Sequence, residues 1–161
     1  MSEPNPPDWA RRKSLPHEPP DWVDPAEEIY FVTVNCRQRD TDTLCHPQTA
    51  DAIFESIVFR NRSGAWFCHL CLLMPDHLHA LISFTNPLKT IQQTISDWKR
   101  WLAGSLGIEW QRDFFEHRLR SESEEREKAD YILHNPVRRT LVSRSEDWPF
   151  VWRPREDDIR R

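Results

Sequence analysis

The stretch from Met74 to Phe84 constrains the fold of this chain more than any other, because a turn is followed directly by a strand with alternating side chains. Met-Pro-Asp interrupts regular structure, since proline fixes φ and an Asp side chain bonds to nearby backbone. Side chains then alternate between two faces of a strand. One face carries Leu78, Ala80, Ile82 and Phe84, and the other carries His77, His79, Leu81 and Ser83. The two histidines therefore share a face, about 7 Å apart along the strand.

Two imidazoles at this spacing can hold one divalent ion, because imidazole is the commonest metal ligand in proteins. The alternative interpretation is a pair of half-buried histidines that bind no metal. The residues that the rest of the chain brings nearby decide between the two.

Size and composition predict one globular domain. The chain has 161 residues, of which 38% are hydrophobic, and a net charge of −4. Because the overall charge is negative, a nucleic-acid site would need local clustering of basic residues. The sequence holds no apolar run near the 18 or so residues that span a bilayer, and no secretory segment. We therefore expect a cytoplasmic protein without a membrane partner.

Cys68 and Cys71 have the Cys-x-x-Cys spacing of a zinc half-site. They fall in a predicted strand, where positions i and i+3 face opposite sides of the sheet, and no turn residue stands between them. We therefore expect reduced core cysteines, together with Cys36 and Cys45, rather than a structural zinc module.

Periodicity and turn signals predict seven elements. Strands are expected over residues 28–39, 66–74, 77–84 and 114–120, and helices over residues 47–62, 88–106 and 121–134. Pro136 is expected to stop the third helix near Asn135. The first six elements follow the β-α-β-β-α-β order of the ferredoxin-like fold. The sequence thus predicts an α+β domain with a four-stranded antiparallel sheet and an additional C-terminal helix.

Composition divides the chain into three parts. Residues 1–25 hold seven of the thirteen prolines without periodicity, which predicts a disordered or surface-wrapping arm. Residues 26–150 hold the predicted domain, and residues 151–161 form a basic tail. Since the first two helices cover one sheet face, we expect the histidine face to be open, with the third helix near it.

The third helix places Tyr131 and Asn135 four residues apart on one helix face. A protonated tyrosine is a poor nucleophile, but near a divalent cation that polarises a phosphate it can attack phosphorus and form a covalent intermediate. Asn135 offers a carbonyl oxygen that can join two imidazoles on a hard cation. In the alternative interpretation, Tyr131 is a packing residue and Asn135 caps the helix.

Basic residues near the ends of the predicted elements and on the second helix could hold a nucleic-acid backbone. These candidates are Arg37, Arg39, Lys99, Arg100, Arg118 and Arg120. Exposed members of the set of eight tryptophans could stack unpaired bases, although most of the eight are expected in the core.

Three motifs in this order resemble the single-tyrosine HUH transposases of the insertion-sequence 200-like class, and among them the REP-associated tyrosine transposases. The motifs are Met74-Pro75-Asp76-His77-Leu78-His79, Trp110-Gln111-Arg112-Asp113-Phe114-Phe115-Glu116-His117 and Tyr131-Ile132-Leu133-His134-Asn135-Pro136-Val137-Arg138. The resemblance covers about residues 28–150. Two positions depart from it, because His134 stands where the family often has an asparagine, and Arg139-Thr140 where it often has a glycine.

The resemblance implies a ferredoxin-like nuclease that cleaves and rejoins single-stranded DNA. Its partner would be hairpin or palindromic repeats, and it would act as a monomer or homodimer at the nucleoid. The family pattern implies Mg²⁺ or Mn²⁺ held by His77 and His79 and completed by Asn135, with His134 as a possible additional ligand. Tyr131 would form a 5′-phosphotyrosine link and release a 3′-hydroxyl.

The rival hypothesis is a domesticated, non-catalytic DNA- or RNA-binding protein on the same fold. The presence of His77, His79 and Tyr131 together favours catalysis, since a protein that only binds has no need of all three. An RNA-recognition domain would carry a Lys/Arg-Gly-Phe-type motif on a central strand, and the sequence lacks one.

Overall fold

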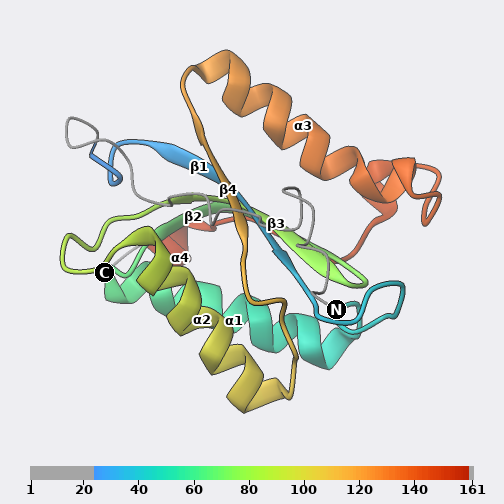
Figure 1. Ribbon diagram of the computed structural model, residues 1–161. Helices are drawn as coiled ribbons and strands as arrows, with labels where there is room; N and C mark the ends of the chain where they lie inside the picture. The colour runs from blue at the N-terminus through green and yellow to red at the C-terminus, as the bar shows by residue number, and fades with distance from the viewer. Residues whose placement is uncertain (1–23, 160–161) are drawn as a thin grey trace, which may run out of the picture.

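The computed structural model describes residues 24–159, so nearly all of the predicted N-terminal arm lies outside the described residues. The elements follow the predicted order (Figure 1). The strands are β1 (Ile29–Asn35), β2 (Phe67–Met74), β3 (His77–Ser83), β4 (Phe115–Leu119) and β5 (Val151–Trp152). The helices are α1 (Pro47–Ser63), α2 (Ile91–Leu106), α3 (Glu122–Arg138) and α4 (Glu156–Ile159), with a 3-10 turn η2 (Ser145–Asp147).

The five strands form one antiparallel sheet in the order β4-β1-β3-β2-β5. This arrangement confirms the predicted ferredoxin-like α+β fold. The predicted four-stranded sheet lacked β5, which pairs with Cys71 and Leu72 at the outer edge of β2. β5 has only two residues, which is too short for the alternation of apolar and polar side chains that identifies a strand in a sequence. The segment predicted as a basic tail, residues 151–161, therefore begins inside the sheet.

The sheet separates two layers of helices (Figure 1). α1 and α2 cover one face, and α3 crosses the other. Alternation along β3 sends Leu78, Ala80 and Ile82 into the core beneath α1 and α2. Leu81 points the other way, into a smaller core that includes Ile132 of α3. The predicted division of the β3 side chains between two faces is confirmed.

α2 begins at Ile91, three residues later than the helical periodicity predicted. The Thr90 side chain accepts the N–H of Gln93, and the Gln93 side chain accepts the N–H of Thr90. This capping box satisfies two of the unpaired groups at the helix start and leaves Leu88 exposed before it. None of the helices in the described part of the chain is long and apolar enough to cross a membrane.

α3 runs through Pro136 and ends at Arg138, whereas the sequence predicted a stop near Asn135. Proline has no N–H for the carbonyl of Ile132 one turn earlier, so it removes one helical hydrogen bond close to the helix end. The carbonyl of Asn135 still accepts the N–H of Arg139 at 3.0 Å. The last turn therefore closes around the proline and keeps Asn135 inside the helix.

After α3 the chain returns along the far edge of the sheet. Trp148 Nε1 donates to the carbonyl of Leu73 at 2.9 Å, and the Leu73 N–H donates to the carbonyl of Phe150 at 2.9 Å. β5 follows, and α4 then lies against α1, where Arg62 donates to the carbonyl of Asp157 at 3.2 Å. α3 is thus connected to β4 at one sheet edge and to β5 at the other.

The cysteines are free thiols, as predicted. The prediction that Cys68 and Cys71 face opposite sides of the sheet is wrong, however. A β-bulge between Cys68 and Leu70 shifts the register, so both cysteines lie in the core beneath α1 and α2. Burial raises the pKa of the Cys68 thiol to about 12, which disfavours the thiolate that zinc requires.

Candidate active site

His77 and His79 lie side by side on β3, with ring centroids 4.8 Å apart. Both are on the α3 side of the sheet, and the His79 ring lies 6.1 Å from the ring of Tyr131. Only 5% and 6% of the two histidines is exposed. The histidine face is thus less open than the sequence predicted, because α3 packs Ile132 onto the same side of the sheet.

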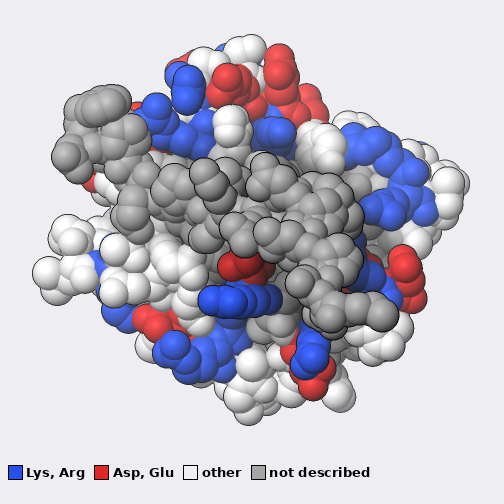
Figure 2. Space-filling model, in the orientation of Figure 1, with Lys and Arg blue, Asp and Glu red and all other residues white. Residues whose placement is uncertain are grey.

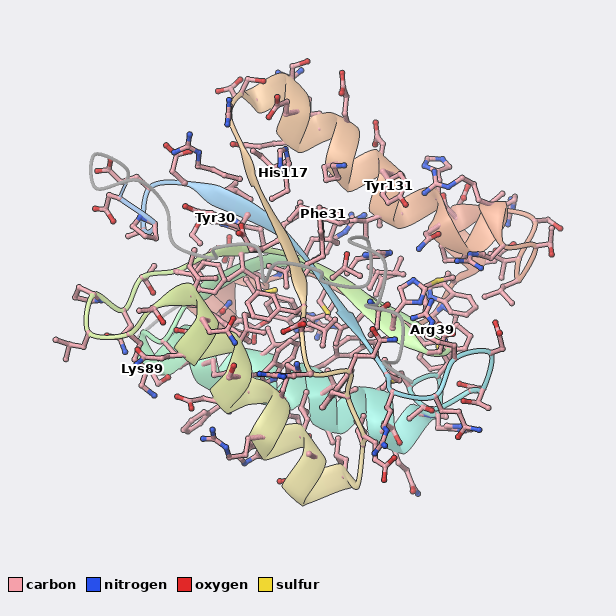
Figure 3. The ribbon with its side chains drawn as sticks, viewed as in Figure 1. Tyr30, Phe31, Arg39, Lys89, His117 and Tyr131 are labelled. Atoms are coloured by element: carbon pink, nitrogen blue, oxygen red, sulfur yellow. The ribbon has the colours of Figure 1, made fainter. Side chains whose placement is uncertain are left out.

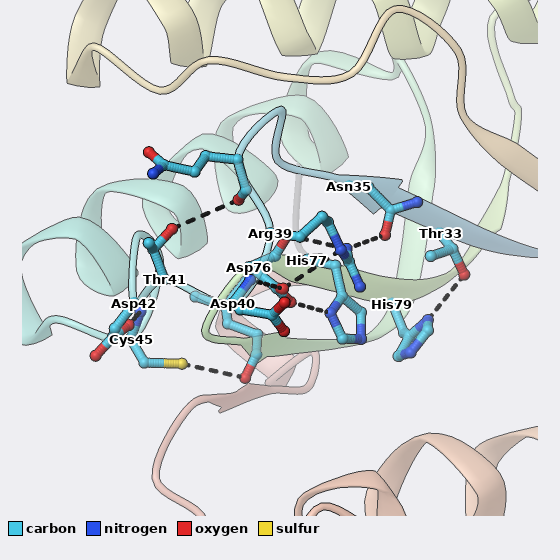
Figure 4. A network of polar contacts seen from close by, with 12 residues as sticks. Thr33, Asn35, Arg39, Asp40, Thr41, Asp42, Cys45, Asp76, His77 and His79 are labelled. Atoms are coloured by element: carbon cyan, nitrogen blue, oxygen red, sulfur yellow. Dashed lines mark hydrogen bonds and ion pairs between the residues drawn. The ribbon is translucent and has the colours of Figure 1, made fainter.

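Each imidazole is oriented by a contact at Nδ1 (Figure 4). His77 Nδ1 lies 2.7 Å from Oδ1 of Asp76, and His79 Nδ1 lies 2.8 Å from Oγ1 of Thr33. Because a carboxylate only accepts hydrogen bonds, the Asp76 contact places a proton on Nδ1 of His77. Nε2 of His77 keeps a lone pair, and this is how proteins commonly orient a metal-binding histidine.

Asp76 is itself held by the loop that follows β1 (Figure 4). Its Oδ2 accepts the N–H of Asp40 at 2.9 Å and lies 3.3 Å from Nε of Arg39. Arg39 also donates to Oδ1 of Asn35 and to the carbonyl of Asp76. Burial would raise the pKa of Asp76, but its donors, with His77 first among them, lower that pKa below its ordinary value. Asp76 is therefore an ionised acceptor at neutral pH.

Burial keeps both histidines uncharged at pH 7. Desolvation, together with a smaller effect of nearby positive charges, lowers the pKa of His79 to about 3. Desolvation also lowers the pKa of His77, although Asp76 opposes the shift. Neutral imidazoles offer lone pairs, so both side chains are in the state that a metal ligand requires.

Tyr131 lies between α3 and the sheet, close to Phe31 (Figure 3). Its ring is perpendicular to the Phe31 ring at 6.1 Å, and 44% of the residue is exposed. Two cations lie over the Tyr131 ring, the Lys128 ammonium at 5.2 Å and the Arg138 guanidinium at 4.2 Å from its centroid. Arg138 also donates to the Tyr131 carbonyl. The exposed phenol therefore stands beside a neutral histidine and two positive charges.

The two other candidate ligands on α3 differ in exposure. Asn135 is buried one turn beyond Tyr131. His134 is exposed, and its Nδ1 lies 2.8 Å from the carbonyl of Asp130 on the same helix. Within residues 24–159, no three His, Cys, Asp or Glu side chains form a metal-binding group. A cation at the histidine pair would take its further ligands from the Asn135 amide, water or phosphate, which are oxygen donors suited to Mg²⁺ or Mn²⁺.

The predicted phosphate-binding residues do not form one surface. Lys99 is buried, and its ammonium group donates to the carbonyls of Gln111 at 2.8 Å and Arg112 at 2.9 Å, so it stabilises the segment after α2. Arg100 is exposed on α2, which covers the opposite face from the histidines. Arg118 pairs across the sheet with Tyr30, which points into the core beneath α1 and α2, so Arg118 also faces away from the histidines.

The remaining predicted arginines, Arg37, Arg39 and Arg120, lie in loops beside β1 and β4 and are exposed. The cations that contact the candidate nucleophile are instead Lys128 and Arg138, which were not among the predicted residues. Their spacing from Tyr131, three residues before and seven after, places all three side chains on one helix face. That spacing is the signal in the sequence that could have identified them.

Charge is unevenly distributed along α3 (Figure 2). Three glutamates, beginning with Glu122, occupy its first turn, where they suit the positive end of the helix dipole. Lys and Arg side chains gather toward its C-terminal end, where Arg138 and Arg139 lie. A polyanion is therefore attracted to the C-terminal half of α3, which carries Tyr131. Beside it, a cavity of about 290 Å³ is lined by His77, Asp76 and Arg139 among others.

The fold of this chain is similar to that of a solved tyrosine transposase. The chain superposes on the solved structure of a REP-associated tyrosine transposase bound to a REP hairpin with a TM-score of 0.66 and 24% identity, over 94% of this chain and 82% of that one. A Haemophilus influenzae protein named "Putative REP-associated tyrosine transposase" is 29% identical over 50% of this chain and 54% of its own length. No protein-family model matches.

These similarities confirm the fold and the resemblance to the REP-associated tyrosine transposases that the three motifs indicated. The chain spans about half the length of the curated relative that it matches.

Proposed function

We propose that this chain is a divalent-metal-dependent single-stranded DNA endonuclease and transposase that cleaves and rejoins DNA through a 5′-phosphotyrosine. The observation that carries the proposal is the contact between Tyr131 and His79, whose rings lie 6.1 Å apart although they come from different elements. The other histidine, His77, is neutral and oriented beside them. Tyr131 is also 44% exposed, so a strand of DNA can reach its phenol, which a tyrosine that only packs does not require.

The charges beside Tyr131 and the similarity to a solved transposase both support a DNA substrate. Lys128 and Arg138 flank the phenol with positive charge that suits a phosphate backbone. The solved REP-associated transposase is bound to a REP hairpin. For this chain we therefore infer single-stranded or hairpin repeats in the host DNA, which would place the protein at the nucleoid.

The reaction is a transesterification. The Tyr131 hydroxyl loses its proton to water and its oxygen attacks the scissile phosphorus. A bond forms between them, the bond to the 3′ oxygen breaks, and that oxygen takes up a proton and leaves as a 3′-hydroxyl. Mg²⁺ or Mn²⁺ held by His77, His79 and Asn135 would supply polarisation of the phosphate. Lys128 and Arg138 offset the charge of the phosphate as it approaches the phenol. Rejoining reverses these steps, because a 3′-hydroxyl attacks the phosphotyrosine and frees Tyr131.

The test is a denaturing-gel assay for a covalent protein–DNA species, with the single-stranded repeats that flank the protein's own gene. Tyr131→Phe should form no adduct while retaining DNA binding, because only the nucleophilic oxygen is lost. His79→Ala should lose metal-dependent cleavage while basic contacts still hold DNA. Tyr30→Phe is the control, since Tyr30 is the other tyrosine and is buried beneath α1 and α2.

Two results would contradict this proposal. An adduct in Tyr131→Phe would show that another residue is the nucleophile. Tight binding of the repeats by the wild-type protein with no adduct in Mg²⁺ or Mn²⁺ would favour the alternative, a domesticated, non-catalytic DNA- or RNA-binding protein on the same fold.

A further inference from the structure

Phe115 is an exposed aromatic side chain on the same side of the sheet as the candidate active site. It lies on the edge strand β4 and is 47% exposed. The other large exposed aromatic side chains within residues 24–159 are Tyr131 on α3 and, on the opposite layer, Phe59 and Trp101. The edge of the Phe115 ring meets Phe31 at a centroid distance of 6.1 Å. Much of the phenyl ring therefore remains available to a planar apolar ligand.

The register of the sheet connects Phe115 directly with the histidine pair. Phe115 pairs with Thr33 of β1, and Thr33 pairs in turn with His79 of β3. The contact from Thr33 Oγ1 to His79 Nδ1 shows that this row of side chains points toward α3. Because neighbouring strands lie about 4.8 Å apart, the backbones of Phe115 and His79 are separated by roughly 10 Å. A nucleotide adjacent to a phosphate at His79 can reach Phe115.

Lys128 supplies positive charge at Phe31, the ring that lies between Phe115 and the nucleophile. Its ammonium lies 4.8 Å from the centroid of Phe31 and 5.2 Å from that of Tyr131. Phe31 is the ring that contacts both Phe115 and Tyr131, each at a centroid distance of 6.1 Å. Figure 3 shows Phe31 below Tyr131. A strand of DNA that presents a phosphate to Tyr131 therefore runs past Lys128, with its next base toward Phe115. Phosphate charge and base surface both meet complementary groups along this path.

We propose that Phe115 is a stacking subsite for the unpaired nucleobase next to the scissile phosphate. This inference rests on the proposed function and adds to it the position at which the protein binds the strand beside the cut. Every base has a π-face, so the subsite accepts any base and fixes the position of the strand rather than its sequence. The sequence suggested a stacking role for exposed tryptophans; within residues 24–159 the exposed tryptophan is Trp101, which lies on the opposite layer, so here the stacking role is assigned to a phenylalanine.

The experiment uses the full chain and the repeat oligonucleotide, with one fluorescent 2-aminopurine moved through the positions around the cleavage site. Phe115→Leu keeps an apolar side chain against Phe31 but removes the planar ring. Phe115→Trp keeps a stacking surface. Phe59→Leu is the matched control, because Phe59 is an equally large exposed ring on α1, and on the far side of the sheet.

Wild type, Phe115→Trp and Phe59→Leu should quench 2-aminopurine at one position beside the cut, and Phe115→Leu should not. Phe115→Leu should also bind the oligonucleotide about tenfold more weakly. An abasic nucleotide at that position should weaken oligonucleotide binding by the wild-type protein by a similar factor. It should hardly weaken binding by Phe115→Leu any further, because both changes remove the same contact.

Wild-type quenching and affinity in Phe115→Leu, or additive losses with the abasic strand, would overturn the stacking subsite. With the Tyr131 adduct intact, those results leave the proposed function standing. Failure of the wild-type protein to bind any single-stranded repeat overturns both.

Discussion

Arg39 was predicted to bind DNA, but in the structure it contacts residues of the candidate site. Its guanidinium lies 3.3 Å from the Asp76 carboxylate, which in turn lies 2.7 Å from His77. Arg39 therefore orients a candidate metal ligand through one intervening carboxylate. Its side chain is 38% exposed, so the ion pair adds little to the stability of the fold. Its effect should be local to His77.

Replacement of Arg39→Gln is expected to weaken Mn²⁺ binding by up to about tenfold, the lower end of the effect of losing the direct partner of a metal ligand, because Arg39 acts on His77 through Asp76. Calorimetric titration of Mn²⁺ into the protein without DNA measures this directly. Arg37→Gln is the control, since Arg37 is exposed two residues earlier. Unchanged Mn²⁺ affinity, together with a salt dependence of DNA binding reduced by about one phosphate contact, would instead make Arg39 a DNA ligand.

At the scale of the element, α3 carries the nucleophile and the cations that accompany it on a single face. Lys128, Tyr131 and Arg138 share that face, and the carbonyl of Tyr131 accepts a hydrogen bond from Arg138. Continuation of the helix through Pro136 is what brings Arg138 into this row. A helix that stopped at Asn135 would have left the arginine in a loop.

Replacement of Lys128→Gln should lower the salt dependence of single-stranded DNA binding by about one phosphate contact, because the ammonium over Phe31 and Tyr131 lies on the path of the strand. Fluorescence anisotropy over a range of salt concentrations gives this slope. Arg126→Gln on the same helix is the control, since Arg126 is exposed and pairs with Glu122 at 3.4 Å. Equal slopes for the wild type and both variants would remove Lys128 from the DNA path.

At the scale of the whole molecule, the candidate site is assembled within one chain. The histidines come from β3, the tyrosine from α3, and the rings of His79 and Tyr131 are in contact at 6.1 Å without a second copy. A monomer therefore has every group that the proposed reaction uses. Exchange of α3 between two copies is not needed to complete the site.

A mixture of Tyr131→Phe and His79→Ala is therefore expected to form no adduct at any protein concentration. In each variant a necessary group is missing from the only chain that could supply it. The denaturing-gel assay used for the single variants measures the outcome, with equal amounts of wild type and Tyr131→Phe as the positive control. Recovery of adduct in the mixture would show that the tyrosine of one copy acts at the histidines of another.

Local patterns were enough to predict the ferredoxin-like order and the shared face of His77 and His79, because alternation along a strand depends on consecutive residues alone. They were not enough for contacts set by register. Thr33 meets His79 only through the pairing of β1 with β3. The bulge beside Cys68 and the two-residue β5 likewise depend on a neighbouring strand rather than on their own sequence.

The connection of α3 to both edges of the sheet has a kinetic consequence. β4 leads into the helix at one edge, and the segment through Trp148 to β5 fastens the chain at the other. The helix that carries Tyr131 is therefore anchored to the sheet at both of its ends. The effective concentration of the phenol at the histidines is thus fixed when the protein folds. The incoming strand of DNA is then the partner that must lose translational and rotational freedom before the phosphate meets the phenol.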